Sequence, residues 1–126
     1  PRQMRYGEHT DYTGFTILRQ DAPGLEVFIG DQWVPVPVVP GGFVVNAGDL
    51  IQRWTNNVWR SNLHRVANPE HSVRSSGRLS LVFFTGPNDD TVIEPLDVCV
   101  SSDRPAAYAP VRADEHLRQK LAVSNV

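Results

Sequence analysis

His9 and Asp11 are two residues apart in the stretch GEHTDYTGF, immediately before a strand-like run. Alternate side chains of an extended chain project to the same face, so this imidazole and this carboxylate are expected to point together. A second histidine, His64, lies in the β-like segment SNLHRV. Two histidines and one carboxylate can occupy one face of an octahedral metal ion and leave the remaining positions open. This ligand set suits non-haem Fe(II), which must bind a cosubstrate and dioxygen together.

A second pair with possible chemistry is Arg78 and Ser80 in the stretch RLSLVFF, at the start of an apolar strand-like run. Their spacing again puts both side chains on one face of a strand. A guanidinium fork and a hydroxyl group together bind a carboxylate well, because the arginine adds geometry as well as charge. The sequence therefore favours a metal site and, deeper inside the fold, a carboxylate-binding site that suits a short dicarboxylate.

Each of these patterns is weak when taken alone, and each has a rival. His71 is an alternative third ligand, but it lies in the Pro-, Ser- and Gly-rich stretch NPEHSVRSSG, which is expected to be a loop, so His64 is favoured. Arg74 and Ser76 repeat the R-x-S spacing in that same loop. The pair that opens the strand is favoured over them, because apolar walls exclude water and strengthen an ion pair.

Four further residues are expected behind the metal ligands or in the substrate pocket. Asn46 and Ser61 are candidates for orienting the ligands, because metal-bound imidazoles usually donate their other N–H to a partner. Tyr12 directly follows the H-T-D sequence, and Phe84 shares a strand face with Ser80. Both are predicted to line the pocket.

Other conspicuous residues have structural interpretations. Trp54 and Trp59 are expected to pack in the core or at its rim, with substrate contact as the alternative. Asp49 is predicted to cap a short helix rather than to bind metal. His116 is expected on the surface of a terminal helix.

Glycines and prolines divide the chain into short runs rich in β-branched and aromatic residues, which is typical of an all-β fold. With 126 residues the chain is expected to form one domain. The spacing of the runs favours a sandwich or jelly roll. The predicted strands cover residues 15–19, 25–29, 32–35, 43–47, 61–66, 79–85 and 91–94.

Turn chemistry supports this division. Gly30 and Asp31 could close a tight hairpin, and Pro40 with the two glycines after it predicts a sharp turn. Prolines at 35, 37 and 40 lack amide donors, so that stretch must be an edge strand or leave the sheet. Two helices are expected, a short one over 49–56 and one over 114–122 with Leu117 and Leu121 on its apolar face.

The net charge of −2 gives no electrostatic reason to expect nucleic acid or an anionic membrane as a partner. A single cysteine, Cys99, cannot form an internal disulfide, which favours a reducing compartment and predicts a cytoplasmic location. No run approaches the length of a membrane span, and no signal-peptide pattern opens the chain.

The blocks H-T-D, N-x-G-D-x-x-Q-x-W-T-N, S-x-x-H-R-V and R-x-S stand in this order over roughly residues 5–95. In this order they resemble the C-terminal core of the iron- and 2-oxoglutarate-dependent dioxygenases, in the isopenicillin N synthase-like branch. The resemblance implies a double-stranded β-helix, or jelly roll, followed by a short C-terminal helix. Residues 1–112 would form this core and residues 113–126 the helix and tail.

The resemblance also implies roles for individual residues. His9, Asp11 and His64 would be the iron ligands, and Arg78 with Ser80 would hold the distal carboxylate of 2-oxoglutarate. The implied activity is oxidation of a small organic substrate coupled to decarboxylation of 2-oxoglutarate, with hydroxylation as the default outcome. Fe(II) would be the cofactor, and 2-oxoglutarate and dioxygen the cosubstrates.

Two alternatives stay open at this point. The protein could be a non-haem iron oxidase that uses no 2-oxoglutarate, in which case the R-x-S pair would hold a substrate carboxylate. It could also be a truncated and catalytically silent jelly-roll module. Members of the family carry a long N-terminal portion that is missing here, so the natural protein is expected to be longer, or a partner to cover the exposed sheet edge.

Overall fold

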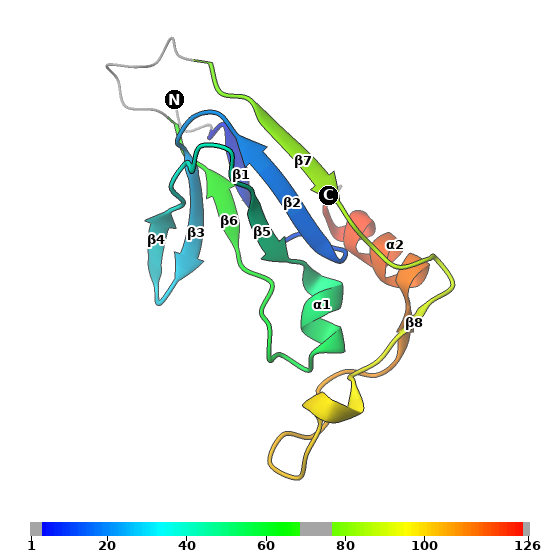
Figure 1. The fold of residues 1–126 in the computed structure, drawn as a ribbon. Coiled ribbons are helices and arrows are strands. Elements are labelled where there is room, and N and C mark those ends of the chain that lie inside the picture. Colours follow the sequence, from blue (N-terminus) through cyan, green and yellow to red (C-terminus); the bar gives the residue numbers. More distant parts are fainter. Residues whose placement is uncertain (1–3, 69–76, 125–126) are drawn as a thin grey trace.

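Two antiparallel sheets on either side of a cavity form most of the computed structural model, which describes residues 4–68 and 77–124 (Figure 1). The four-stranded sheet has the order β1 (Tyr6–His9), β6 (His64–Val66), β3 (Leu25–Ile29) and β4 (Gln32–Pro35). The three-stranded sheet has the order β5 (Val44–Ala47), β2 (Phe15–Gln20) and β7 (Ser80–Phe84). This is the jelly-roll architecture that the sequence predicted.

The remaining elements lie beside these sheets (Figure 1). They are the helix α1 (Asp49–Trp54), the two-stranded sheet of β8 (Val92–Ile93) and β9 (Val111–Arg112), the 3-10 helix η2 (Asp97–Cys99) and the C-terminal helix α2 (Ala113–Ser124). Leu50, Ile93 and Ala113 form a buried cluster where α1, β8 and α2 meet, and Trp54 packs against it. The predicted core role of Trp54 is therefore confirmed.

The predicted turns occur where expected. Gly30 and Asp31 have φ values of 54° and 64°, and they join β3 to β4 with Ile29 paired to Gln32. Positive φ at both central positions defines the hairpin turn whose twist matches that of the strands. β4 ends at Pro35 and lies at the edge of its sheet, as its missing amide donor requires.

Two strands escaped prediction. β1 has a polar sequence, YGEH, and three of its four residues are exposed, so no hydrophobic alternation marks it. Its conformation comes from pairing with β6, in which Tyr6 lies opposite Val66 and His9 opposite His64. β9 is only two residues long and pairs with β8. Contacts with distant segments, rather than local propensity, form both strands.

The helices differ from prediction in detail. Gly48 is the N-cap of α1, and Asp49 is the first helical residue rather than the cap. The Asp49 carboxylate instead lies 2.7 Å from Lys120 Nζ of α2. The predicted apolar face of α2 was also wrong, because its buried residues are Ala113 and His116 whereas Leu121 is 43% exposed.

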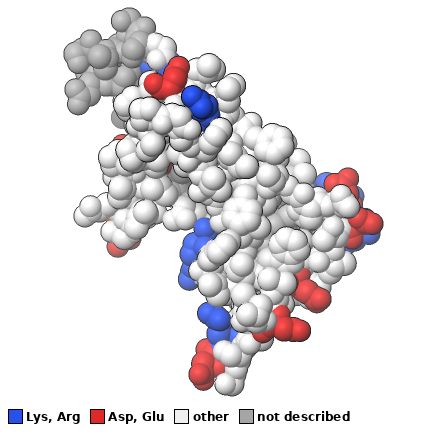
Figure 2. Space-filling model, viewed as in Figure 1, with Lys and Arg blue, Asp and Glu red and all other residues white. Residues whose placement is uncertain are grey.

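Charged groups of both signs are scattered over the face of the molecule that Figure 2 shows. Figure 2 shows acidic and basic side chains mixed around the edge of the visible face, with no broad basic area. None of the helices in the described residues is long and apolar enough to cross a membrane.

Candidate metal and cosubstrate site

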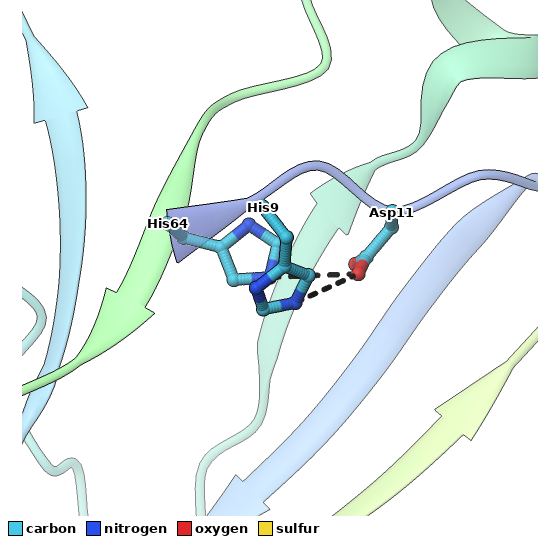
Figure 3. Close-up of side chains that lie close together, drawn as sticks. All are labelled: His9, Asp11 and His64. Carbon is cyan, nitrogen blue, oxygen red and sulfur yellow. Dashed lines mark ion pairs between the residues drawn. The ribbon is translucent and has the colours of Figure 1, made fainter. Parts of the chain in front are cut away.

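His9, Asp11 and His64 come together at one end of the pairing between β1 and β6 (Figure 3). His9 ends β1 and His64 begins β6, and because they are register partners their ring centroids lie 4.3 Å apart. Asp11 Oδ1 lies 3.8 Å from His9 Nε2 and 3.4 Å from His64 Nε2. Within residues 4–68 and 77–124, this is the one group of three metal-ligating residues with ligand atoms within 4.8 Å of one another.

Both imidazoles are oriented for metal binding. His9 Nδ1 lies 2.8 Å from the carbonyl oxygen of Gly7, and His64 Nδ1 lies 3.0 Å from that of Asn62. A carbonyl oxygen can only accept, so each Nδ1 donates its hydrogen. The lone pair of each neutral ring is then on Nε2, which faces Asp11. The donor set therefore fits a divalent transition metal with one side open.

The carboxylate of Asp11 is only 5% exposed and is held by two donors. Thr16 Oγ1 donates to Asp11 Oδ2 at 2.5 Å, and Asn46 Nδ2 donates to the same oxygen at 2.6 Å. Oδ1 is thus left toward the two histidines. The sequence pointed to Asn46 as a partner of an imidazole, but Asn46 orients the carboxylate, and backbone carbonyls lie beside the two imidazole Nδ1 atoms. Thr16 was missed because a threonine in a strand is ordinarily interpreted as a β-former.

The surroundings of Asp11 and His64 shift the pKa values of both side chains. Burial by itself raises the pKa of Asp11, but the adjacent His64 and the hydrogen bonds from Thr16 and Asn46 outweigh it and hold the pKa well below its usual range. Burial lowers the pKa of His64, yet the adjacent Asp11 and the Asn62 carbonyl raise it above the ordinary histidine value. Asp11 is therefore an anion at neutral pH, as a metal ligand must be.

The segment after Asp11 is fixed by the start of α1. The amide of Asp49 donates to Asp11 O at 2.8 Å, and the amide of Gly48 donates to Gly14 O at 2.7 Å. A Cβ at Gly48 would lie 2.5 Å from Thr13 O, so only glycine permits this approach. The first turn of α1 thus sets the position of a metal ligand.

The helix α2 supports the same segment from the other side. His116 is 5% exposed, and its Nε2 donates to Tyr12 O at 3.1 Å. The expectation that His116 lies on the surface was therefore wrong, because it packs under the metal-binding segment. Burial, followed by Arg53 and Lys120, lowers the pKa of His116, so the neutral ring is favoured.

Arg78 lies two residues before the first residue of β7 and is held by three acceptors. Its Nη1 donates to Ser80 Oγ at 2.5 Å, its Nη2 to Gln20 Oε1 at 2.8 Å and its Nε to Ala22 O at 3.1 Å. Thr16 and Gln20 lie on the same face of β2, four residues apart, which corresponds to roughly 13 Å of strand. The metal triad and the Arg78 clamp therefore face the same space.

That space is a cavity of about 1100 Å³ between the two sheets. The triad, Arg78, Ser80, Asn46 and Phe84 all lie in its wall. Tyr12 and Ser61 are not among the described residues that line it. The amide of Ser61 donates to Gln52 Oε1 at 2.8 Å, so Ser61 supports the loop after α1 instead of the metal ligands. The rival residues His71, Arg74 and Ser76 lie outside the described residues.

Comparisons with known proteins agree with this geometry. Residues 1–87 match the family model described as the 2OG-Fe(II) oxygenase superfamily. The chain is 54% identical over 99 residues to the 2-oxoglutarate-dependent dioxygenase caaD of Aspergillus niger, covering 71% of this chain and 31% of that protein. It is 40% identical over 126 residues to gibberellin 3-beta-dioxygenase 1 of Arabidopsis thaliana, covering 98% and 34% respectively.

A solved structure agrees with the family match. The crystal structure of a full-length Neurospora crassa protein in complex with alpha-KG superposes with a TM-score of 0.87 at 34% identity, covering 98% of this chain and 39% of that chain. The chain therefore belongs to the 2OG-Fe(II) oxygenase superfamily. It spans about a third of the length of the curated relatives it matches.

Proposed function

We propose that the protein is an Fe(II)- and 2-oxoglutarate-dependent oxygenase that oxidises a small organic substrate. In the default reaction, 2-oxoglutarate, dioxygen and a substrate C–H group give succinate, carbon dioxide and the hydroxylated product. One observation carries this proposal. A two-histidine, one-aspartate set with ligand atoms within 4.8 Å of one another lies in the same cavity as Arg78 and Ser80, on the same side of β2.

Within this proposal each residue has a defined task. His9 and His64 would hold the metal through Nε2, while Thr16 and Asn46 occupy Asp11 Oδ2 and leave Oδ1 for the metal. When bound, the iron supplies the oxidising chemistry.

At the other end, Arg78 and Ser80 would bind the distal carboxylate of 2-oxoglutarate. Gln20 and Ala22 hold the guanidinium in place before the cosubstrate arrives, which lowers the entropy lost on binding. The apolar part of the cavity wall limits the access of water and strengthens the ion pair.

We further propose that additional chain completes the substrate pocket. Phe84 and Trp59 line the cavity but are 60% and 55% exposed, so this part of the wall is open to solvent. The relatives are about three times as long as the span that this chain matches. The N-terminal portion expected from the family would be the covering segment.

Coupled turnover tests the proposal. Dioxygen uptake and succinate release are measured with Fe(II), with and without 2-oxoglutarate, for the full natural chain. We expect both signals to require 2-oxoglutarate and iron, and to disappear in His64→Ala. Arg118→Gln, which changes an exposed arginine on α2, is the control and should behave like the wild type. Oxygen uptake that needs no 2-oxoglutarate would instead support the iron oxidase alternative.

A further inference from the structure

Arg60 lines the same cavity from the loop that follows α1. The backbone on both sides of this residue is fixed. The amide of Trp59 donates to Thr55 Oγ1 at 3.1 Å, and the amide of Ser61 donates to Gln52 Oε1 at 2.8 Å. Arg60 is therefore presented by an anchored loop rather than by a loose one.

The loop is also tied to the C-terminal part of the chain. Asn56 is 1% exposed, and its Nδ2 lies 3.1 Å from both Cys99 O and Pro105 O. Asn56 and Asn57 have φ values of 48° and 67°, a conformation that asparagine tolerates better than most residues. Tyr108 donates its hydroxyl hydrogen to Asn57 Oδ1 at 2.5 Å. These bonds fix the turn that leads to Trp59 and Arg60.

The guanidinium of Arg60, in contrast, is unpartnered. Among residues 4–68 and 77–124 it has no hydrogen bond, ion pair or ring contact. Arginine keeps its positive charge at every relevant pH and carries five N–H donors. An anchored loop therefore carries a permanent cation that lines the cavity, and because Arg60 is exposed its N–H donors face solvent and are open to a ligand.

The loop that carries Arg60 lies beside the end of β2 opposite to the end that holds Arg78. The ring of the neighbouring Trp59 packs edge-on against Phe15, with centroids 5.8 Å apart. Phe15 begins β2, whereas Gln20, which binds Arg78, ends it. Five residues of strand separate these ends by roughly 16 Å. The metal-binding Asp11 is bonded to Thr16, so the Arg60 end is the one nearer the metal.

The balance of charge in the cavity favours a further anion. Its described lining contains three arginines, Arg5, Arg60 and Arg78, and a single acidic residue, Asp11. Burial and then the nearby Arg5 lower the pKa of Arg78, so Arg5 and Arg78 share one end. The charge of a divalent metal ion and the charge of the dianion 2-oxoglutarate cancel each other. The charges of Asp11 and Arg78 likewise cancel, so the positive charge of Arg60 at the metal end has no acidic counterpart left among the described residues that line the cavity.

We propose that Arg60 binds a carboxylate of the substrate and that Trp59 and Phe15 pack against the adjacent carbon skeleton, so that the substrate is an apolar organic acid. This inference rests on the proposed function, because it assigns the metal and Arg78 to iron and 2-oxoglutarate. A guanidinium fork matches a carboxylate in geometry and charge. The neighbouring rings supply the apolar surface that a small-molecule pocket uses for affinity.

Binding measurements without dioxygen test the inference and avoid turnover. The full natural chain is loaded with Mn(II) and 2-oxoglutarate, and phenylalkanoic acids of increasing chain length are titrated by calorimetry beside their primary amides. Acid and amide have almost the same shape but differ in charge. The variants are Arg60→Gln, which removes the charge, Arg60→Lys, which keeps it, and Arg118→Gln as a surface control.

The wild type should bind the best acid about tenfold more tightly than its amide. Arg60→Gln should remove this preference through weaker acid binding, with the amide and 2-oxoglutarate unaffected. Arg60→Lys should keep part of the preference, and Arg118→Gln all of it.

Three results would overturn the inference. The wild type could bind neither acid nor amide, it could bind acid and amide with equal affinity, or Arg60→Gln could lose the same affinity for the acid as for the amide. Weaker 2-oxoglutarate binding in Arg60→Gln would also overturn it, by assigning Arg60 to the cosubstrate. The wild type could also bind the acid through Arg60 but fail to bind 2-oxoglutarate. That result would support the Arg60 site and would contradict the proposed function instead.

Discussion

Arg78 and Arg60 line one cavity beside opposite ends of β2, in very different surroundings. Arg78 donates to Ser80, Gln20 and Ala22. Arg60 sits on an anchored loop, but its guanidinium contacts no partner among the described residues. One cation is therefore oriented before any ligand binds, and the other is oriented only by what it binds.

The difference fits the two tasks that we assign. A cosubstrate is the same molecule in every turnover, so a preoriented arginine loses little side-chain entropy when it binds. A guanidinium without fixed partners keeps its rotamer freedom until a ligand arrives, and the anchored loop limits the space it can reach. We therefore expect substitutions at the Arg78 end to change cosubstrate affinity, and substitutions at the Arg60 end to change substrate affinity.

The largest expected effect concerns the metal between these two ends. His64→Ala removes one of three ligands, so Mn(II) binding should be lost, as measured by calorimetric titration of the metal-free protein. Circular dichroism establishes that the variant is folded. Stoichiometric Mn(II) binding by folded His64→Ala would contradict the assigned ligand set.

The next effect separates the two arginines. Arg78→Ala should weaken 2-oxoglutarate binding by about 2–5 kcal/mol, because a charge-assisted bond to a carboxylate in a partly buried site is lost. Mn(II) affinity should not change. Arg60→Gln should leave 2-oxoglutarate affinity as it is in the wild type. An equal loss of 2-oxoglutarate affinity in Arg78→Ala and Arg60→Gln would contradict the separate roles assigned to the two arginines.

A smaller effect is expected from the groups that orient Asp11. Thr16→Val keeps the shape of the side chain and removes the donor to Oδ2, so Mn(II) affinity should fall about 10–100-fold. Competition titration with a chelator measures the change, and Thr91→Val, at a position that does not line the cavity, is the control. Unchanged affinity would show that Asn46 alone holds the carboxylate.

The smallest effect is a pH dependence of stability that originates in α2. The pKa of His116 is lowered in the folded protein, so the unfolded chain binds its proton first as pH falls. Stability from this group is therefore present above the ordinary histidine pKa and is lost as pH decreases below it. The groups around it are Arg53, Lys120, Asp49 and the Tyr12 carbonyl.

His116→Gln removes this contribution. The melting temperature of the Mn(II)-loaded wild type should fall more between about pH 7.5 and about pH 6 than that of the variant. Parallel melting curves over this range would mean that His116 does not titrate with unfolding.

Local patterns predicted much of the framework. Gly30 and Asp31 predicted the hairpin, and short runs of β-branched and aromatic residues between glycines and prolines predicted most strands, because both signals depend on neighbours in the chain. The polar strand β1 could not be recognised locally, since it is extended only through its pairing with β6. Spacing and resemblance pointed to His9, Asp11 and His64, which the fold brings together.

Other parts of the site depend on contacts that no local pattern encodes. His116 is 104 residues from Tyr12 in sequence, and nothing in its helix predicts that it donates to that carbonyl. The amide of Asp49 reaches Asp11 O only because α1 is packed against the metal-binding segment. The anchored loop that presents Arg60 likewise depends on Asn56 meeting residues of the C-terminal part of the chain.

A crystal structure of the full natural chain, grown without dioxygen in the presence of Fe(II) and 2-oxoglutarate, tests the central claim most directly. We predict iron bound by His9 Nε2, His64 Nε2 and Asp11 Oδ1, with the distal carboxylate of 2-oxoglutarate on Arg78 and Ser80. Iron bound by other residues, or the distal carboxylate on Arg60, would contradict the account.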